Sequence, residues 1–208
     1  MTIKTFNINS DKTAFVRAYL PDSIAGLPFC EKRPAVLIFP GGGYEYCSDR
    51  EGEPIALQYL ALGYSAFVVT YSCNERFPEP LMDAAYIFYK IRMRAEEFKI
   101  DPQKMAVLGC SAGGHLAGCL ATMWSDIALT KTIGCEPEDL RPNAAILCYP
   151  VISGVTAPHE GSFKVLLGED ASRSDLSRLS LENRVTPKTP PVFIWATAND
   201  DCVSAHNS

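Results

Sequence analysis

Long apolar runs are missing from this 208-residue sequence. No stretch approaches the roughly twenty apolar residues that a membrane-spanning helix needs, and residues 1–8 have no apolar core of the length found in a secretory signal. We therefore expect no membrane association and a cytoplasmic location. The composition, 47% hydrophobic and 21% charged, is that of a globular chain, most simply one domain over residues 1–208.

Basic clusters and closely spaced cysteine pairs are missing as well. The net charge is -5, and the lysines and arginines are scattered along the chain, which argues against a nucleic-acid partner. The eight cysteines are irregularly spaced and contain no C-x-x-C pair. We therefore expect free thiols rather than a disulfide framework.

Short apolar runs alternate with helical patterns. Ser48 to Glu51 has the form of a capping box that opens a helix through Leu62, and apolar residues recur every three or four positions from Leu81 to Phe98. Residues 3–8 and 14–20 alternate in polarity and predict an antiparallel hairpin at the edge of a sheet. Five runs lack such alternation and predict parallel strands buried on both faces: 35–39, 66–70, 105–108, 144–149 and 192–197. The predicted class is α/β, with a mostly parallel sheet flanked by helices.

A G-x-S-x-G motif at residues 109–113 follows one of these runs and precedes a helix-forming stretch, residues 115–120. Strand, tight turn and helix in this order are the context of a nucleophile elbow, in which flanking glycines permit a sharp turn and the serine hydroxyl stands exposed. We therefore predict that Ser111 is a catalytic nucleophile.

Three consecutive glycines, Gly41 to Gly43, follow the apolar run that ends at Phe39. Without side chains, the amides of such a loop can point at a developing oxyanion. We predict that the oxyanion donors are the N–H groups of Gly42, Gly43 and Ala112. Ala112 is included because it begins a helix, where its N–H has no intrahelical partner. The alternative for the glycine run is an ordinary flexible turn.

The stretch from about residue 153 to 188 is polar and is expected to hold short helices and loops above the carboxyl ends of the strands. It is either a cap-like insertion over the active site or an ordinary long crossover. His159 lies in this stretch, and we propose it as a residue that meets the substrate. The alternative is a surface histidine.

Four segments together resemble a known family. Residues 38–44, 48–54, 109–117 and 159–162 are similar to bacterial acetyl esterases of the xylan-deacetylating type, which belong to the α/β-hydrolase superfamily. The resemblance covers nearly the whole chain. It implies an α/β-hydrolase fold and a serine carboxylesterase that acts on acetylated or short-acyl esters of sugars or xylan oligosaccharides.

The resemblance also implies where the catalytic acid lies. Members of the superfamily place it after the strand that matches residues 191–197, three residues before a valine, which selects Asp200 here. Such an aspartate can orient a histidine by accepting from its Nδ1. Asp201 is the rival, and a structural role in a turn is the alternative for either aspartate.

Histidine is scarce, with three in the chain, and none is well placed as the catalytic base. The superfamily order of serine, acid and histidine puts the base beyond Asp200, after one more strand. His206 follows Asp200 too closely for that, and His115 is expected to point down the elbow helix into the core. We therefore expect the chain to lack the family's last strand, base and final helix, with the base beyond residue 208.

The predicted reaction is acyl transfer through an acyl-enzyme that water hydrolyses, and it needs neither a metal nor an organic cofactor. The expected partner is a small ester or an oligosaccharide ester, and the sequence does not indicate an oligomeric state. Two alternatives remain. One is a serine peptidase of the prolyl-oligopeptidase type, which shares the elbow, and the other is a non-catalytic α/β-hydrolase scaffold.

Overall fold

The computed structural model describes residues 1–8, 13–23 and 32–207. Within these residues, seven strands form one sheet in the order β1-β2-β4-β3-β5-β6-β7. The hairpin β1–β2 pairs antiparallel with β4, and all other neighbours are parallel, so the predicted α/β class and edge hairpin are confirmed. The strands are β1 (Thr2–Asn7), β2 (Phe15–Leu20), β3 (Arg33–Phe39), β4 (Ser65–Thr70), β5 (Ile100–Cys110), β6 (Ala144–Cys148) and β7 (Val192–Trp195).

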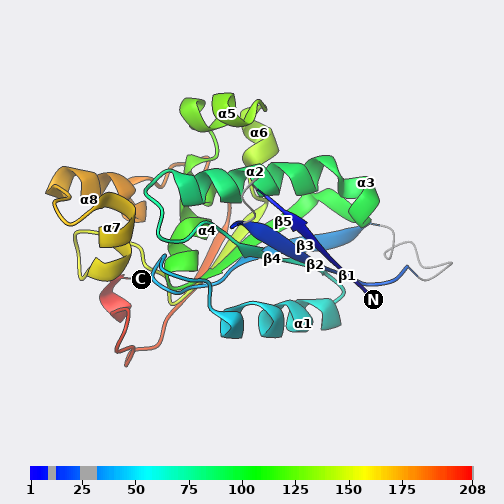
Figure 1. Ribbon diagram of the computed structural model, residues 1–208, viewed down its shortest axis with the longest axis horizontal. Helices are drawn as coiled ribbons and strands as arrows, with labels where there is room; N and C mark the ends of the chain where they lie inside the picture. Colours follow the sequence, from blue (N-terminus) through cyan, green and yellow to red (C-terminus); the bar gives the residue numbers. More distant parts are fainter. Residues whose placement is uncertain (9–12, 24–31, 208) are drawn as a thin grey trace.

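Helices cover both faces of the sheet (Figure 1). Helix α1 lies on one face, whereas α2, α3 and α4 lie on the other. The α-helices are α1 (Glu53–Ala61), α2 (Glu79–Met93), α3 (Ala95–Phe98), α4 (Ala112–Met123), α5 (Ile127–Ile133), α6 (Pro137–Leu140), α7 (Glu160–Leu167) and α8 (Arg173–Leu179).

Two apolar clusters, one on each face, hold these layers together. Successive side chains of a strand point to opposite faces, so β3 contributes to both: Leu37 and Phe39 join the large cluster under α2 and α4, whereas Val36 and Ile38 pack with Ala56 of α1. Each fully buried aliphatic side chain contributes roughly 1.5–3 kcal/mol to stability. Residues 35–39 of β3 and 105–108 of β5, at the centre of the sheet, are accordingly all apolar, as the sequence predicts.

The predicted capped helix from Ser48 to Leu62 is wrong at its start. Residues Asp49–Glu51 form a separate 3-10 turn, and the Ser48 side chain makes no capping hydrogen bond. The backbone breaks at Gly52, and α1 then begins beside Pro54, whose fixed φ suits the first turn of a helix. Glu51, the expected partner of Ser48 in the capping box, makes other bonds that are described below.

The other helical predictions are confirmed with changed boundaries. The predicted helix over 81–98 is divided into α2 and α3, and it ends at Lys99 in the left-handed region (φ +54°) rather than at Asp101. The stretch 153–188 contains α7, α8 and a 3-10 turn, Leu181–Asn183. Whether this stretch acts as a cap over the active site stays a prediction.

Candidate active site

The turn between β5 and α4 places Ser111 at the carboxyl end of the sheet. Ser111 has φ +52° and ψ -120°, which is the left-handed half of backbone space that a residue with a Cβ rarely adopts. Glycine is required on both sides: a Cβ on Gly109 would lie 2.0 Å from the Gly113 oxygen, and one on Gly113 would lie 2.0 Å from the Phe39 oxygen. The predicted strained turn at a strand-to-helix junction is confirmed.

The glycine loop follows β3 and lies against this turn. A Cβ on Gly41 would come within 2.9 Å of the Ser111 Cβ. Gly42 and Gly43 have positive φ values, +129° and +66°, and among the described residues their N–H groups have no hydrogen-bond acceptor. Ala112 is the first residue of α4, so its N–H has no acceptor within the helix. The three amides predicted as oxyanion donors are thus free for a ligand.

A cavity of about 410 Å³ collects most of the predicted site residues. Ser111, Gly42, Gly43, Asp200 and His159 all line it. They come from four separate parts of the chain that the parallel strands bring to one edge of the sheet, because the carboxyl ends of parallel strands meet there. The remaining lining residues are Glu45, Tyr46, Ser48, Arg50, Glu51, Tyr149, Gly161, Cys202 and Val203.

The two candidate acids differ in their surroundings. The Oδ1 atom of Asp200 accepts from the N–H groups of Cys202 and Val203, at 2.9 and 2.8 Å. These two bonds close a turn and hold the carboxylate in place. Its other oxygen stays available in the cavity. Asp201 is exposed and does not line the cavity. The geometry thus favours Asp200 as the acid, and its catalytic role stays a prediction.

Two histidines make hydrogen bonds unrelated to Ser111. His115 is buried, and its Nε2–H donates to the Leu179 carbonyl at 2.9 Å while Nδ1 accepts from the Tyr44 hydroxyl at 2.8 Å. Burial lowers the pKa of His115 to about 4. His159 caps α7, because its Nδ1 accepts from the Ser162 N–H. The neutral ring of His159 therefore carries its proton on Nε2, where it can donate to a substrate.

The third histidine, His206, is exposed in the 3-10 turn Ala205–Asn207. Across the described ranges, no histidine makes a hydrogen bond with the Ser111 hydroxyl. The identity of the catalytic base therefore stays a prediction. The described residues contain no group of three or more His, Cys, Asp or Glu side chains that could hold a metal ion.

Glu51 and Tyr149 are functional candidates that the sequence analysis missed. The Glu51 carboxylate accepts from the Gly41 N–H at 2.7 Å through one oxygen and from the Tyr149 hydroxyl at 3.0 Å through the other. Burial raises the pKa of Tyr149, so this hydroxyl stays protonated and donates. Glu51 thereby connects the glycine loop with the loop after β6, beside Ser111. The position of Tyr149, directly after a strand, was the available signal. Glu51 had none, because its sequence fitted a capping box.

The chain matches the BD-FAE family over residues 27–208. It is 37% identical over 184 residues to an endo-1,4-beta-xylanase B from Butyrivibrio fibrisolvens. This match covers 85% of the chain and 28% of that protein. It is 31% identical to an acetylxylan esterase from Xylanibacter ruminicola, over 95% of this chain and 38% of that protein. The chain thus spans less than two fifths of the length of these curated relatives.

Among solved structures, an acetyl ester-xyloside bifunctional hydrolase from Caldicellulosiruptor lactoaceticus superposes with a TM-score of 0.84 at 33% identity. The match covers 98% of this chain and 78% of that one. No helix in the described part of the chain is long and apolar enough to cross a membrane.

Proposed function

The chain belongs to the BD-FAE family of the α/β-hydrolase superfamily, and from this membership we propose that it carries the nucleophile of a serine carboxylesterase. The proposed substrates are acetyl and other short-acyl esters of sugars or xylan oligosaccharides. An acetylxylan esterase and an acetyl ester-xyloside bifunctional hydrolase among its relatives support this class. A cytoplasmic location is part of the proposal and is tested by cell fractionation.

One observation carries the proposal. Ser111 stands at positive φ in a cavity that Gly42 and Gly43 also line, and the N–H groups of these glycines have no acceptor in the described part of the chain. Such amides can stabilise the negative charge that develops on the carbonyl oxygen when an ester is attacked. A serine that served only in packing would need neither the strained backbone nor the free donors.

In the proposed mechanism, the Ser111 hydroxyl attacks the ester carbonyl while a histidine accepts its proton. The carbonyl oxygen becomes an oxyanion that accepts from the N–H groups of Gly42, Gly43 and Ala112. The histidine then gives its proton to the leaving oxygen, so that the tetrahedral species expels the sugar alcohol, and water releases the acyl group from Ser111 in a second cycle. Asp200 orients and stabilises the histidine, and His159 Nε2–H contacts the sugar.

The decisive experiment is labelling by a fluorophosphonate probe. In a form of the enzyme that supplies the catalytic histidine, we expect the probe to react at Ser111, and Ser111→Ala to abolish both the labelling and any release of p-nitrophenol from p-nitrophenyl acetate. Unchanged labelling in Ser111→Ala would mean that another residue is the nucleophile. Turnover of a prolyl peptide amide in preference to acetyl esters would favour the peptidase alternative. A form of the enzyme that supplies the catalytic histidine but neither labels nor hydrolyses would favour the scaffold.

A further inference from the structure

Two thiols approach each other beside the glycine loop. The Sγ atoms of Cys47 and Cys73 are 3.7 Å apart, and both side chains are half-buried. The seven cysteines within the described ranges are all free thiols, as predicted, and Cys30 lies outside those ranges. Since a disulfide has an S–S distance of about 2.05 Å, a modest movement of the two side chains would bring the sulfurs to bonding distance.

The segments that carry these thiols already lie side by side. Cys47 ends the glycine loop, and Cys73 follows β4. The Asn74 N–H donates to the Tyr44 oxygen at 2.8 Å, and the Asn74 side-chain amide donates to the Glu45 oxygen at 2.9 Å. A covalent link between Cys47 and Cys73 would therefore strengthen an existing contact without rearranging the fold.

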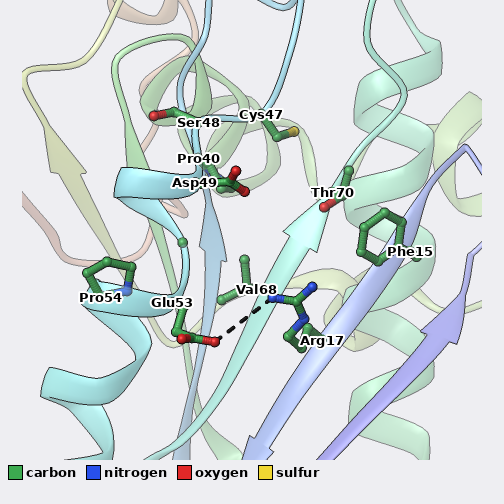
Figure 2. Close-up of a pocket in the computed structure, with 11 residues that line it drawn as sticks. Phe15, Arg17, Pro40, Cys47, Ser48, Asp49, Glu53, Pro54, Val68 and Thr70 are labelled. Atoms are coloured by element: carbon green, nitrogen blue, oxygen red, sulfur yellow. Dashed lines mark ion pairs between the residues drawn. The ribbon is translucent and has the colours of Figure 1, made fainter.

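A second cavity gives small molecules access to Cys47. This cavity has a volume of about 590 Å³ and is lined by residues of β2, β4 and the start of α1, together with Cys47 (Figure 2). Arg17 and Glu53 form an ion pair of 3.9 Å within it. It is distinct from the catalytic cavity, although Ser48 lines both. An oxidant can thus reach Cys47, and with it the Cys73 sulfur 3.7 Å away, without entering the space in front of Ser111.

The local chemistry makes the two sulfurs unequal. A hydrogen bond from the Cys47 thiol lowers the pKa of Cys73, and the bond to Cys73, with burial, raises the pKa of Cys47. Cys73 is therefore the sulfur that loses its proton more readily, and the thiolate is the nucleophilic form of cysteine. Cys47 keeps its proton and is placed to attack second.

We propose that Cys47 and Cys73 form an oxidisable dithiol that a peroxide converts to a disulfide, fixing the glycine loop to the segment after β4. The Cys73 thiolate attacks one peroxide oxygen, which gives a sulfenic acid at Cys73 and releases hydroxide. The Cys47 sulfur then attacks the Cys73 sulfur and the sulfenic oxygen leaves as water. In total, two thiols and one hydrogen peroxide give one disulfide and two waters. This modification is independent of the proposed esterase function.

Peptide mass spectrometry tests the link directly. Trypsin is expected to place Cys47 in the peptide 33–50 and Cys73 in the peptide 51–76, with no other cysteine in either. After the folded, reduced chain is treated with hydrogen peroxide and blocked with N-ethylmaleimide, we expect these two peptides joined, and separated again by dithiothreitol. Oxidation of the exposed Cys202 under the same conditions, with 33–50 and 51–76 still unlinked, would overturn the proposal.

Matched variants separate the pair from the other thiols. We expect Cys47→Ser and Cys73→Ser each to abolish the linked peptide, and Cys202→Ser to leave it unchanged. Hydrogen exchange then reports on the loop: amides of residues 41–48 should exchange more slowly in the oxidised chain than in the reduced chain, and equally in both states of Cys47→Ser. Exchange that does not slow on oxidation would refute the fixing of the loop. Neither readout requires esterase activity.

Discussion

Gly42 has the most restricted position in the glycine loop. Its φ is +129°, and a Cβ there would lie 2.2 Å from the Tyr46 carbonyl oxygen, which belongs to the backbone and cannot move aside cheaply. Gly42→Ala should therefore displace the amide that we assign to the oxyanion. Loss of one such donor typically lowers kcat by about a hundredfold or more. Steady-state kinetics with p-nitrophenyl acetate on an active form of the enzyme measures this effect.

Gly134 provides a matched control for that substitution. It has φ +76° at the end of α5, and a Cβ there would meet nothing within 4 Å. Gly134→Ala should lose roughly 1 kcal/mol of stability from backbone strain and keep its kcat. If Gly42→Ala changes KM alone, the oxyanion assignment of this loop is wrong.

His115 should make the stability of the chain depend on pH. Its pKa is lowered by burial from 6.5 to about 4, so the unfolded state binds a proton on this ring at a higher pH than the folded state does. Stability from this residue is complete above pH 6.5, falls as the pH drops toward 4, and is level below that. At pH 5 the loss is roughly 2 kcal/mol.

Denaturant unfolding at pH 7.5 and pH 5 checks this sign. His115→Gln should be less stable than the wild type at pH 7.5, because the bonds to Tyr44 and Leu179 are disturbed. At pH 5 the difference should shrink by about 2 kcal/mol, since the variant has no ring to protonate. An equal difference at both pH values would contradict the predicted titration.

The role of a single residue could be predicted where one local sequence motif specifies both the side chain and its backbone conformation. The motif around Ser111 fixes both the hydroxyl and the turn that exposes it, so the residue and its conformation could be predicted together. Glu51 acts through bonds to Gly41 and Tyr149, which are distant in sequence. Its local pattern fitted a capping box equally well, and only the fold distinguishes the two roles.

At the scale of elements, the short 3-10 turn Asp49–Glu51 holds two loops together. Both the Gly41 N–H and the Tyr149 hydroxyl donate to Glu51. Glu51→Gln keeps an oxygen that can accept from one of them but turns an NH₂ group toward the other donor, so we expect the glycine loop to loosen. The predicted result is a loss of about 1–3 kcal/mol in unfolding free energy, the usual cost of an unsatisfied buried donor. Fluorophosphonate labelling of Ser111 should also become slower.

Asp49→Asn is the control, because Asp49 lies in the same turn with an exposed side chain. It should change neither the stability nor the labelling rate. Equal behaviour of the Glu51 and Asp49 variants would show that the carboxylate of Glu51 does not hold the loops.

The strands were predictable as elements because buried parallel strands are continuous apolar runs. Helix boundaries were harder to predict. Helix α2 ends before Arg94 although the apolar periodicity continues, and α1 begins only after Gly52. At Gly52 the break accompanies the tertiary bonds of Glu51, which outweigh the local capping pattern. The order of strands in the sheet was also out of reach, because β3 lies between β4 and β5 through non-local pairing that no local pattern encodes.

At the scale of the whole molecule, the two edges of the sheet differ. Strand β1 carries Lys4, a charge of the kind that protects an edge from pairing with other chains. Strand β7, Val-Phe-Ile-Trp, has no charge, and all four of its side chains are exposed, with Phe193 at 62% and Trp195 at 41%. Its outer row of backbone groups has no strand partner in the described part of the chain. The predicted burial of the run 192–197 on both faces is therefore wrong for β7, whose side chains lie exposed at the edge of the sheet.

The 208-residue chain should therefore associate with itself through β7. We expect light scattering after size-exclusion chromatography to give a mass that rises with protein concentration, because an exposed apolar edge is a template for strand pairing. Phe193→Lys places a charge on that edge and should shift the chain toward monomer. Ile3→Lys introduces the same charge on the opposite edge, at a residue that is similarly exposed, and should leave the association unchanged. A wild-type chain that stays monomeric at every concentration, or an equal effect of both substitutions, would rule out β7 as the associating surface.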